Sequence, residues 1–168
     1  MKNFYCSCLW MAFSIAISPS VQAQHRSDLS CDDVGKLILY AQTEFSEILG
    51  KFDSTVVDCN YYYSKVNFGI DSTTTIQSCK GDKGKYTLHF DVYIGNDEIQ
   101  SEIELNNLEA GLDNCLPKVK IKELKPTSGY KRIVQYTYNK MQMTIYLDEV
   151  KNKREMKPLV TISVNSLL

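Results

Sequence analysis

The spacing of apolar residues changes near Val56, and this change constrains the fold more than any other feature of the sequence. Before Val56, apolar residues recur every three or four positions, which is typical of one face of an amphipathic helix. Ser30 stands where a helix N-cap would, and Gly50 where a C-cap would. The sequence therefore predicts a helix between them, with an apolar stripe of Val34, Leu37, Ile38, Ala41, Phe45, Ile48 and Leu49.

After Val56, apolar and polar residues alternate, as they do in strands that bury one face. The first predicted hairpin joins residues 86–94 to residues 99–105 through a short turn. Pairing Ile94 with Ile99 makes one face of this hairpin apolar and the other polar. We therefore expect the apolar face to contact the predicted helix.

The polar face of that hairpin would bring together a histidine and three carboxylates. The same register places His89 opposite Glu104 and Asp91 opposite Glu102. Such a patch could support acid–base chemistry or weak cation binding. It could equally be a solvated face with one favourable and one unfavourable pair, because an open sheet face lacks the concave pocket that catalysis needs.

A second hairpin is predicted from residues 130–138 and 141–148. Pairing Tyr138 with Met141 aligns the apolar residues of both strands, and the same register places Lys131 opposite Asp148. Four further segments are weaker strand candidates: 56–68, 72–80, 118–124 and 159–166.

Together these patterns predict an α+β fold, in which an N-terminal amphipathic helix packs on an antiparallel, meandering β-sheet. No repeat or linker divides the chain after residue 23, so we expect residues 24–168 to form a single α+β domain.

Residues 1–23 have the pattern of a signal peptide. Lys2 precedes an uncharged apolar stretch, and small residues at Val21 and Ala23 suit cleavage before Gln24. The apolar stretch is shorter than a membrane-spanning helix requires. We therefore predict a periplasmic or secreted protein that does not span a membrane.

Export gives the remaining cysteines a structural meaning. Four cysteines follow residue 23, and an even number in an oxidising compartment predicts two disulfides. Three pairings are possible. We expect Cys31–Cys59 and Cys79–Cys115, because each would close a moderate loop between neighbouring elements.

The composition argues against several function classes. Only His25 and His89 are present, so a three-histidine zinc site is impossible, and no metal site or cofactor is predicted. The sequence contains no phosphate-binding loop, nucleophile elbow or zinc-protease motif, so we do not predict an enzyme. Without residues 1–23 the net charge is −2, which argues against nucleic-acid binding.

The clustered tyrosines favour a protein-binding function. Three consecutive tyrosines in a strand cannot all face the core, and exposed tyrosine is enriched in binding hot spots, although tyrosine also simply favours strands. The predicted partner-binding residues are Tyr61, Tyr62, Tyr63, Asp91, Glu102 and Glu104.

The function predicted from these features is that of an exported inhibitor or immunity protein. It would cover the active site of another protein, a toxin or an enzyme that attacks the cell wall or membrane. One alternative is a small-ligand or lipid carrier; another is an accessory protein of envelope assembly. A carrier would have a helix–sheet pocket lined by Phe45, Leu49, Phe90 and Met143.

Overall fold

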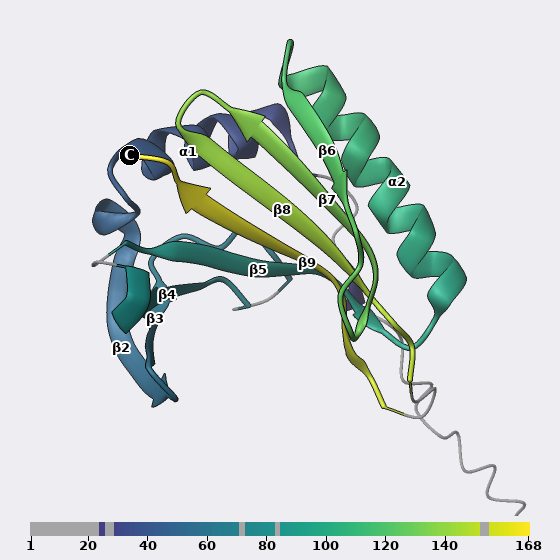
Figure 1. Ribbon diagram of the computed structural model, residues 1–168, viewed down its shortest axis with the longest axis horizontal. Helices are drawn as coiled ribbons and strands as arrows, with labels where there is room; N and C mark the ends of the chain where they lie inside the picture. Colours follow the sequence, from purple (N-terminus) through teal and green to yellow (C-terminus); the bar gives the residue numbers. More distant parts are fainter. Residues whose placement is uncertain (1–23, 26–28, 71–72, 83–84, 152–154) are drawn as a thin grey trace, which may run out of the picture.

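The computed structural model describes residues 24–25, 29–70, 73–82, 85–151 and 155–168. These residues form a mixed α+β structure that is mostly antiparallel sheet (Figure 1). Its elements are β1 (Gln24–His25), α1 (Cys31–Gln42), η1 (Ser46–Ile48), β2 (Leu49–Val56), β3 (Cys59–Ser64), β4 (Thr75–Cys79), η2 (Lys80–Asp82), β5 (Thr87–Gly95), α2 (Glu98–Cys115), β6 (Lys120–Leu124), β7 (Tyr130–Tyr138), β8 (Met141–Asp148) and β9 (Lys157–Ser166).

The sheet has the strand order β2-β3-β4-β5-β9-β8-β7-β6, and β1 pairs with the far end of β5. Neighbouring strands in sequence pair as a meander on both flanks. The C-terminal strand β9 interrupts this order, because it lies between β5 and β8. The centre of the sheet therefore depends on contacts between segments about 70 residues apart.

The first helix begins as predicted and ends earlier. The Ser30 hydroxyl caps α1 by accepting a hydrogen bond from the Asp33 amide. The helix ends at Gln42, and the left-handed backbone of Phe45 separates it from η1. Gly50 is not a C-cap but part of β2, where a Cβ atom would lie 2.4 Å from the Tyr63 carbonyl oxygen. Glycine therefore permits the close approach of β3.

The predicted hairpin between residues 86–94 and 99–105 is wrong, because the second segment begins α2. The Asp97 side chain caps this helix by accepting hydrogen bonds from two backbone amides. Leu105, Leu108 and Leu112 are buried at helical spacing. Residues 99–105 alternate as a strand would, but Leu108 and Leu112, which continue from Leu105 at helical spacing, decide for the helix.

The second predicted hairpin is confirmed over most of its length. Tyr138 pairs with Met141 in the β7–β8 ladder, as expected. A bulge near the other end shifts the register, so that Asp148 lies opposite Tyr130 and not opposite Lys131. The four weaker strand candidates correspond to β3, β4, β6 and β9, whereas β2 was not predicted as a strand.

One buried cluster contains residues of α1 and α2 together with residues of the central strands. Figure 1 shows α1 behind β8 and α2 beside β6 and β7. Alternate residues of the central strands take part in this cluster, including Leu88, Phe90, Ile145, Ile162 and Val164. The other face of the same strands carries polar side chains, so the sheet has one core face and one polar face.

The cysteines form two disulfides, but with a different pairing from the one predicted. Cys31 bonds to Cys115, which joins the start of α1 to the end of α2. Cys59 bonds to Cys79 across the β3–β4 ladder. The predicted pairing fails because residues 98–115 are a helix whose end meets α1. Two disulfides indicate an oxidising compartment outside the cytoplasm.

No helix in the described part of the chain is long and apolar enough to cross a membrane. The predicted signal peptide, residues 1–23, lies outside the described residues.

Candidate functional site: a braced hairpin beside a polar sheet face

The turn between β2 and β3 presents apolar side chains to solvent. We call Val56, Val57 and Asp58 the hairpin tip. Val57 is 90% exposed and Val56 is 54% exposed. The backbone of Val57 has a φ of 56°, in the left-handed region that a β-branched residue rarely adopts. The tip therefore combines an exposed apolar side chain with local backbone strain, and strained backbone conformations are concentrated at functional sites.

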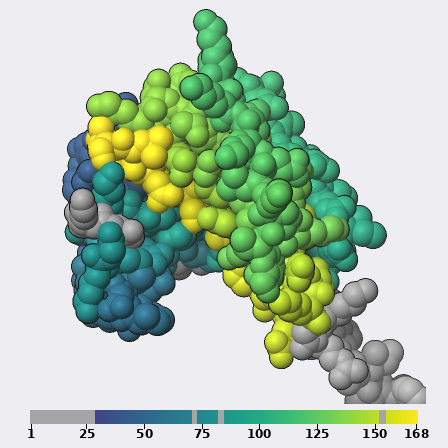
Figure 2. All heavy atoms as spheres, in the orientation of Figure 1, coloured from purple at the N-terminus to yellow at the C-terminus, as the bar shows by residue number. Residues whose placement is uncertain are grey.

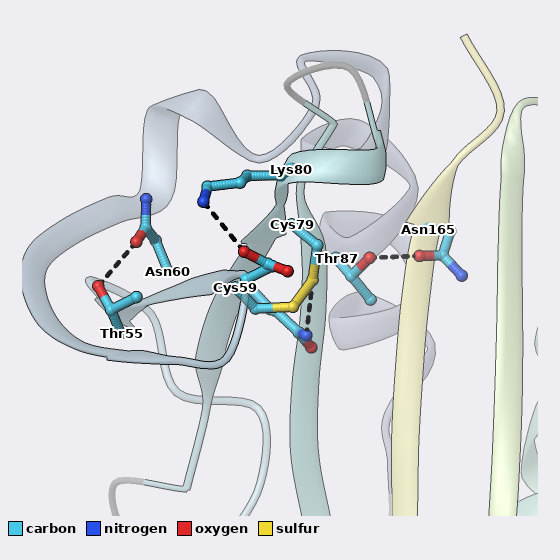
Figure 3. Close-up of a disulfide and its surroundings, with 9 residues drawn as sticks. Thr55, Cys59, Asn60, Cys79, Lys80, Thr87 and Asn165 are labelled. Carbon is cyan, nitrogen blue, oxygen red and sulfur yellow. Dashed lines mark hydrogen bonds and ion pairs between the residues drawn. A yellow bond between two sulfur atoms is a disulfide. The ribbon is translucent and has the colours of Figure 1, made fainter.

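The hairpin tip is held by covalent and polar contacts (Figure 3). Cys59 and Cys79 are directly paired residues of β3 and β4, with their Cα atoms 4.0 Å apart. Lys80 holds Asp58 twice: its backbone amide donates to the Asp58 carbonyl, and its ammonium lies 3.0 Å from the Asp58 carboxylate. The disulfide and these contacts connect the base of the tip to β4 and η2.

Further contacts order the two strands that lead to the tip. The Thr55 hydroxyl donates to the Asn60 side-chain oxygen at 2.8 Å, also visible in Figure 3. Phe52, Tyr62 and Tyr86 form a chain of edge-to-face ring contacts across β2, β3 and the residue before β5, with centroids 5.8 and 6.1 Å apart. Phe52 remains 57% exposed, so this side of the hairpin also presents an aromatic surface.

Tyr63 and Asp53 interact on the same hairpin. The hydrogen bond from the Tyr63 hydroxyl lowers the pKa of the Asp53 carboxyl, and a second hydrogen bond from Ser54 acts in the same direction. The carboxylate in turn raises the pKa of the Tyr63 hydroxyl. Tyr63 is thus a neutral, exposed hydrogen-bonded side chain at neutral pH.

The polar face of the sheet is organised into two rows of side chains that cross the strands. Directly paired residues of an antiparallel sheet share a face, so the ladders define each row. Row 1 consists of Lys120, Thr137, Gln142, Asn165, Thr87, Gln77, Tyr61 and Ser54. Row 2 consists of Lys122, Gln135, Thr144, Ser163, His89, Thr75 and Tyr63.

Hydrogen bonds between β5 and β9 order the centre of this face. Thr87 donates to the Asn165 side-chain oxygen at 2.6 Å, and the Ser163 hydroxyl lies 2.6 Å from His89 Nδ1. Among the described residues, the buried His89 Nε2 has no hydrogen-bond partner. Burial lowers the pKa of His89 to about 4, so the imidazole is neutral at neutral pH.

Two carboxyl groups lie beyond the second row. Asp91 accepts a hydrogen bond of 2.9 Å from the Thr161 hydroxyl. Burial raises the pKa of Asp91, and this hydrogen bond opposes the increase. Burial also raises the pKa of Asp148; Lys157 lowers it and the charge of Asp91 raises it further.

The structure separates the residues predicted to bind a partner. Tyr61 and Tyr63 point to the polar face, whereas Tyr62 packs against the core. Asp91 lies on the polar face of β5, and the expected cluster of His89 and Asp91 with Glu102 and Glu104 does not form.

The two glutamates belong to α2. Glu102 forms an ion pair with Lys131. Glu104 is buried and accepts a hydrogen bond of 2.7 Å from Gln100. These positions are remote from the hairpin, because α2 is on the helical side of the sheet (Figure 1).

The remaining sequence predictions concern metals and a ligand pocket. In the described segments, no group of three or more His, Cys, Asp or Glu side chains is arranged to hold a metal ion. Phe45, Phe90 and Met143, proposed as pocket residues, are fully buried in the hydrophobic core, and Leu49 packs against it.

Sequence reasoning missed the hairpin tip and the polar rows. Two adjacent valines followed by Asp58, between two strand-like segments, were a detectable sign of an apolar turn. The alternating Thr, Gln, Asn and Ser residues of the strands marked the polar face, but their alignment into rows required the strand order. Comparison of the chain with protein-family models, curated proteins and solved structures found no match.

Proposed function

We propose that this protein is an exported protein-binding protein that inserts its hairpin tip into the active-site cleft of another protein. The most concrete form is an inhibitor or immunity protein that neutralises an enzyme attacking the cell wall or membrane. The observation that carries this proposal is Val57, an apolar side chain held 90% exposed in a strained backbone conformation.

The bracing of the tip supports binding energetically. Association loses affinity when a loop must be ordered, so a loop that is already restricted binds more tightly. The Cys59–Cys79 disulfide and the contacts between Lys80 and Asp58 provide such restriction. Exposed Phe52 and Tyr63 lie further along the two strands of the hairpin and supply aromatic area of the kind that is enriched in hot spots.

A carrier function is the second candidate from the sequence, and the packing of the core favours it less. The residues expected to line its pocket fill the space between helices and sheet. An envelope-assembly accessory would use the same exposed hairpin to contact another protein, so it differs from an inhibitor in its partner and in the absence of inhibition.

The test is capture and inhibition with the oxidised protein from Gln24 onward. Tagged protein is mixed with envelope extracts of the source and of competing cells, and stoichiometry is measured by mass spectrometry. We expect one dominant partner near 1:1, a wall- or lipid-degrading enzyme whose purified activity is blocked at equimolar concentration. Val57→Asp should weaken this complex by roughly 30-fold, as for an interface hot spot.

The matched control is Ile99→Asp, which changes a 74% exposed apolar residue of α2. It should leave the affinity within twofold. If no partner is captured, or if Val57→Asp binds as tightly as the unmodified protein, the proposed function is wrong. If a partner is captured but its activity is unaffected, the accessory function replaces the inhibitor.

A further inference from the structure

The two polar rows carry no charged residue apart from Lys120 and Lys122 on β6, although charged residues make up 23% of the chain. Between the lysines on β6 and the tyrosines on β3, the rows contain only Thr, Gln, Asn, Ser and His side chains. His89, the titratable group among them, is neutral at neutral pH. A face that served only to remain solvated would be expected to carry mixed charges, as protein surfaces usually do.

The rows run across the sheet from β3 to β6. Adjacent strands are separated by roughly 4.8 Å, so the seven strands from β3 to β6 span roughly 29 Å. Figure 2 shows the outline of the molecule notched between the β2–β4 region, in blue and teal, and the start of β9, in yellow. In Figure 1, α1 and α2 lie on the other side of the strands. An extended ligand crossing the strands would therefore meet a row 1 side chain at every strand, whereas Thr144 and Ser163 of row 2 are buried.

The chemistry of the rows suits a ligand rich in hydroxyl groups. Hydroxyl and amide side chains can both donate and accept hydrogen bonds, as sugar hydroxyls do. The Asn165 side-chain oxygen accepts from Thr87, which orients its amide nitrogen for donation. A peptide is recognised by a sheet mainly through an unpaired strand edge, whereas the central backbone groups here already pair with neighbouring strands. The tyrosines at the β3 end add ring surfaces.

Charged residues at the β6 edge and on β5 would favour one orientation of a charged ligand on the rows. Lys120 and Lys122 project to the polar face at its β6 edge. In the described part of the chain, neither of them takes part in an ion pair. Asp91 lies beyond row 2 on β5, four strands away from β6. An anionic group would thus be attracted to the β6 edge and repelled near Asp91.

We propose that rows 1 and 2 form a binding site for an acidic oligosaccharide, which crosses the strands with a carboxylate at Lys120 and Lys122 and its hydroxyls on the central amides and hydroxyls. This site shares Tyr63 with the hairpin but contains no residue of the hairpin tip, and its lysines and central side chains do not depend on the proposed inhibitor function.

The test measures binding of hexagalacturonate by isothermal titration calorimetry, with its fully methyl-esterified form as the uncharged ligand of the same skeleton. We expect saturable 1:1 binding of hexagalacturonate that weakens with salt, and binding of the ester at least tenfold weaker. Lys120→Gln/Lys122→Gln should weaken hexagalacturonate binding about fivefold to tenfold. Gln135→Ala/Gln142→Ala should weaken it while leaving its salt dependence unchanged.

The matched control is Lys36→Gln/Lys65→Gln, which removes the same charge from positions on α1 and after β3. Its affinity should stay within twofold of the unmodified protein. The proposal is overturned if hexagalacturonate does not bind, if the ester binds equally well, or if the control variant loses as much affinity as the β6 variant. Equal or tighter binding of hexaglutamate would also overturn it, because the face would then recognise an acidic peptide.

Discussion

The side chain of His89 makes the stability of the folded protein depend on pH. It lies in row 2 beside Ser163, and its buried Nε2 has no hydrogen-bond partner within the part of the chain that the structure describes. Protonation would place a positive charge in this site, which burial opposes. The folded protein therefore binds the proton with a pKa of about 4, below the ordinary value of 6.5.

The expected consequence is an acid-sensitive contribution to stability. Between pH 6.5 and 4 the unfolded chain binds a proton at His89 that the folded protein does not, so the contribution is present above pH 6.5 and is lost as the pH falls towards 4. The free energy of unfolding of the unmodified protein, minus that of His89→Gln, should therefore decrease by roughly 2–3 kcal/mol from pH 7 to pH 4.5. Urea unfolding at both pH values measures this difference.

Comparison with His89→Gln is needed because Asp91 and Asp148 act in the opposite direction. Their raised pKa values mean that the folded protein takes up protons before the unfolded chain does, which favours the folded state as the pH falls. Both proteins contain these carboxyls, so their effect cancels in the difference. A difference that stays constant with pH would contradict the buried, neutral state of His89.

The sequence pattern was misleading for α2 and uninformative for β2, the first strand of the β2–β3 hairpin. The start of α2 shows the alternation of a strand, and two of its three buried leucines, Leu108 and Leu112, lie further along the chain. The β2 strand is exposed along much of its length, so it has little alternation to detect. Edge elements with few buried side chains are stabilised chiefly by their neighbours.

The disulfide between Cys59 and Cys79 should therefore stabilise the β2–β3 hairpin more than the other elements. Its loop has a sequence separation of 20, for which chain entropy predicts a loss of about 3 kcal/mol in Cys59→Ser/Cys79→Ser. We expect hydrogen exchange of the β2 and β3 amides to accelerate more than that of α1 and α2. Equal acceleration throughout would show that the hairpin unfolds only together with the core.

For the whole molecule, the Cys31–Cys115 disulfide joins the two helices that cover the core face. Its sequence separation is 84, and it encloses β2 to β5 within one loop. Chain entropy predicts a loss of about 4.6 kcal/mol in Cys31→Ser/Cys115→Ser, more than for the hairpin disulfide. Urea unfolding of the two double-serine variants should reproduce this order. The reverse order would mean that the native hairpin depends on its disulfide beyond chain entropy.

The sequence by itself determined the mixed α+β class, the Ser30 cap, the β7–β8 register over most of its length and the presence of two disulfides. These features follow from contacts between residues a few positions apart, or from the number of cysteines. The strand order, the disulfide pairing and the alignment of the polar rows were decided only by the tertiary structure. Each depends on β9 entering between β5 and β8 and on α2 meeting α1, and contacts between such distant segments leave no periodic signal in the chain.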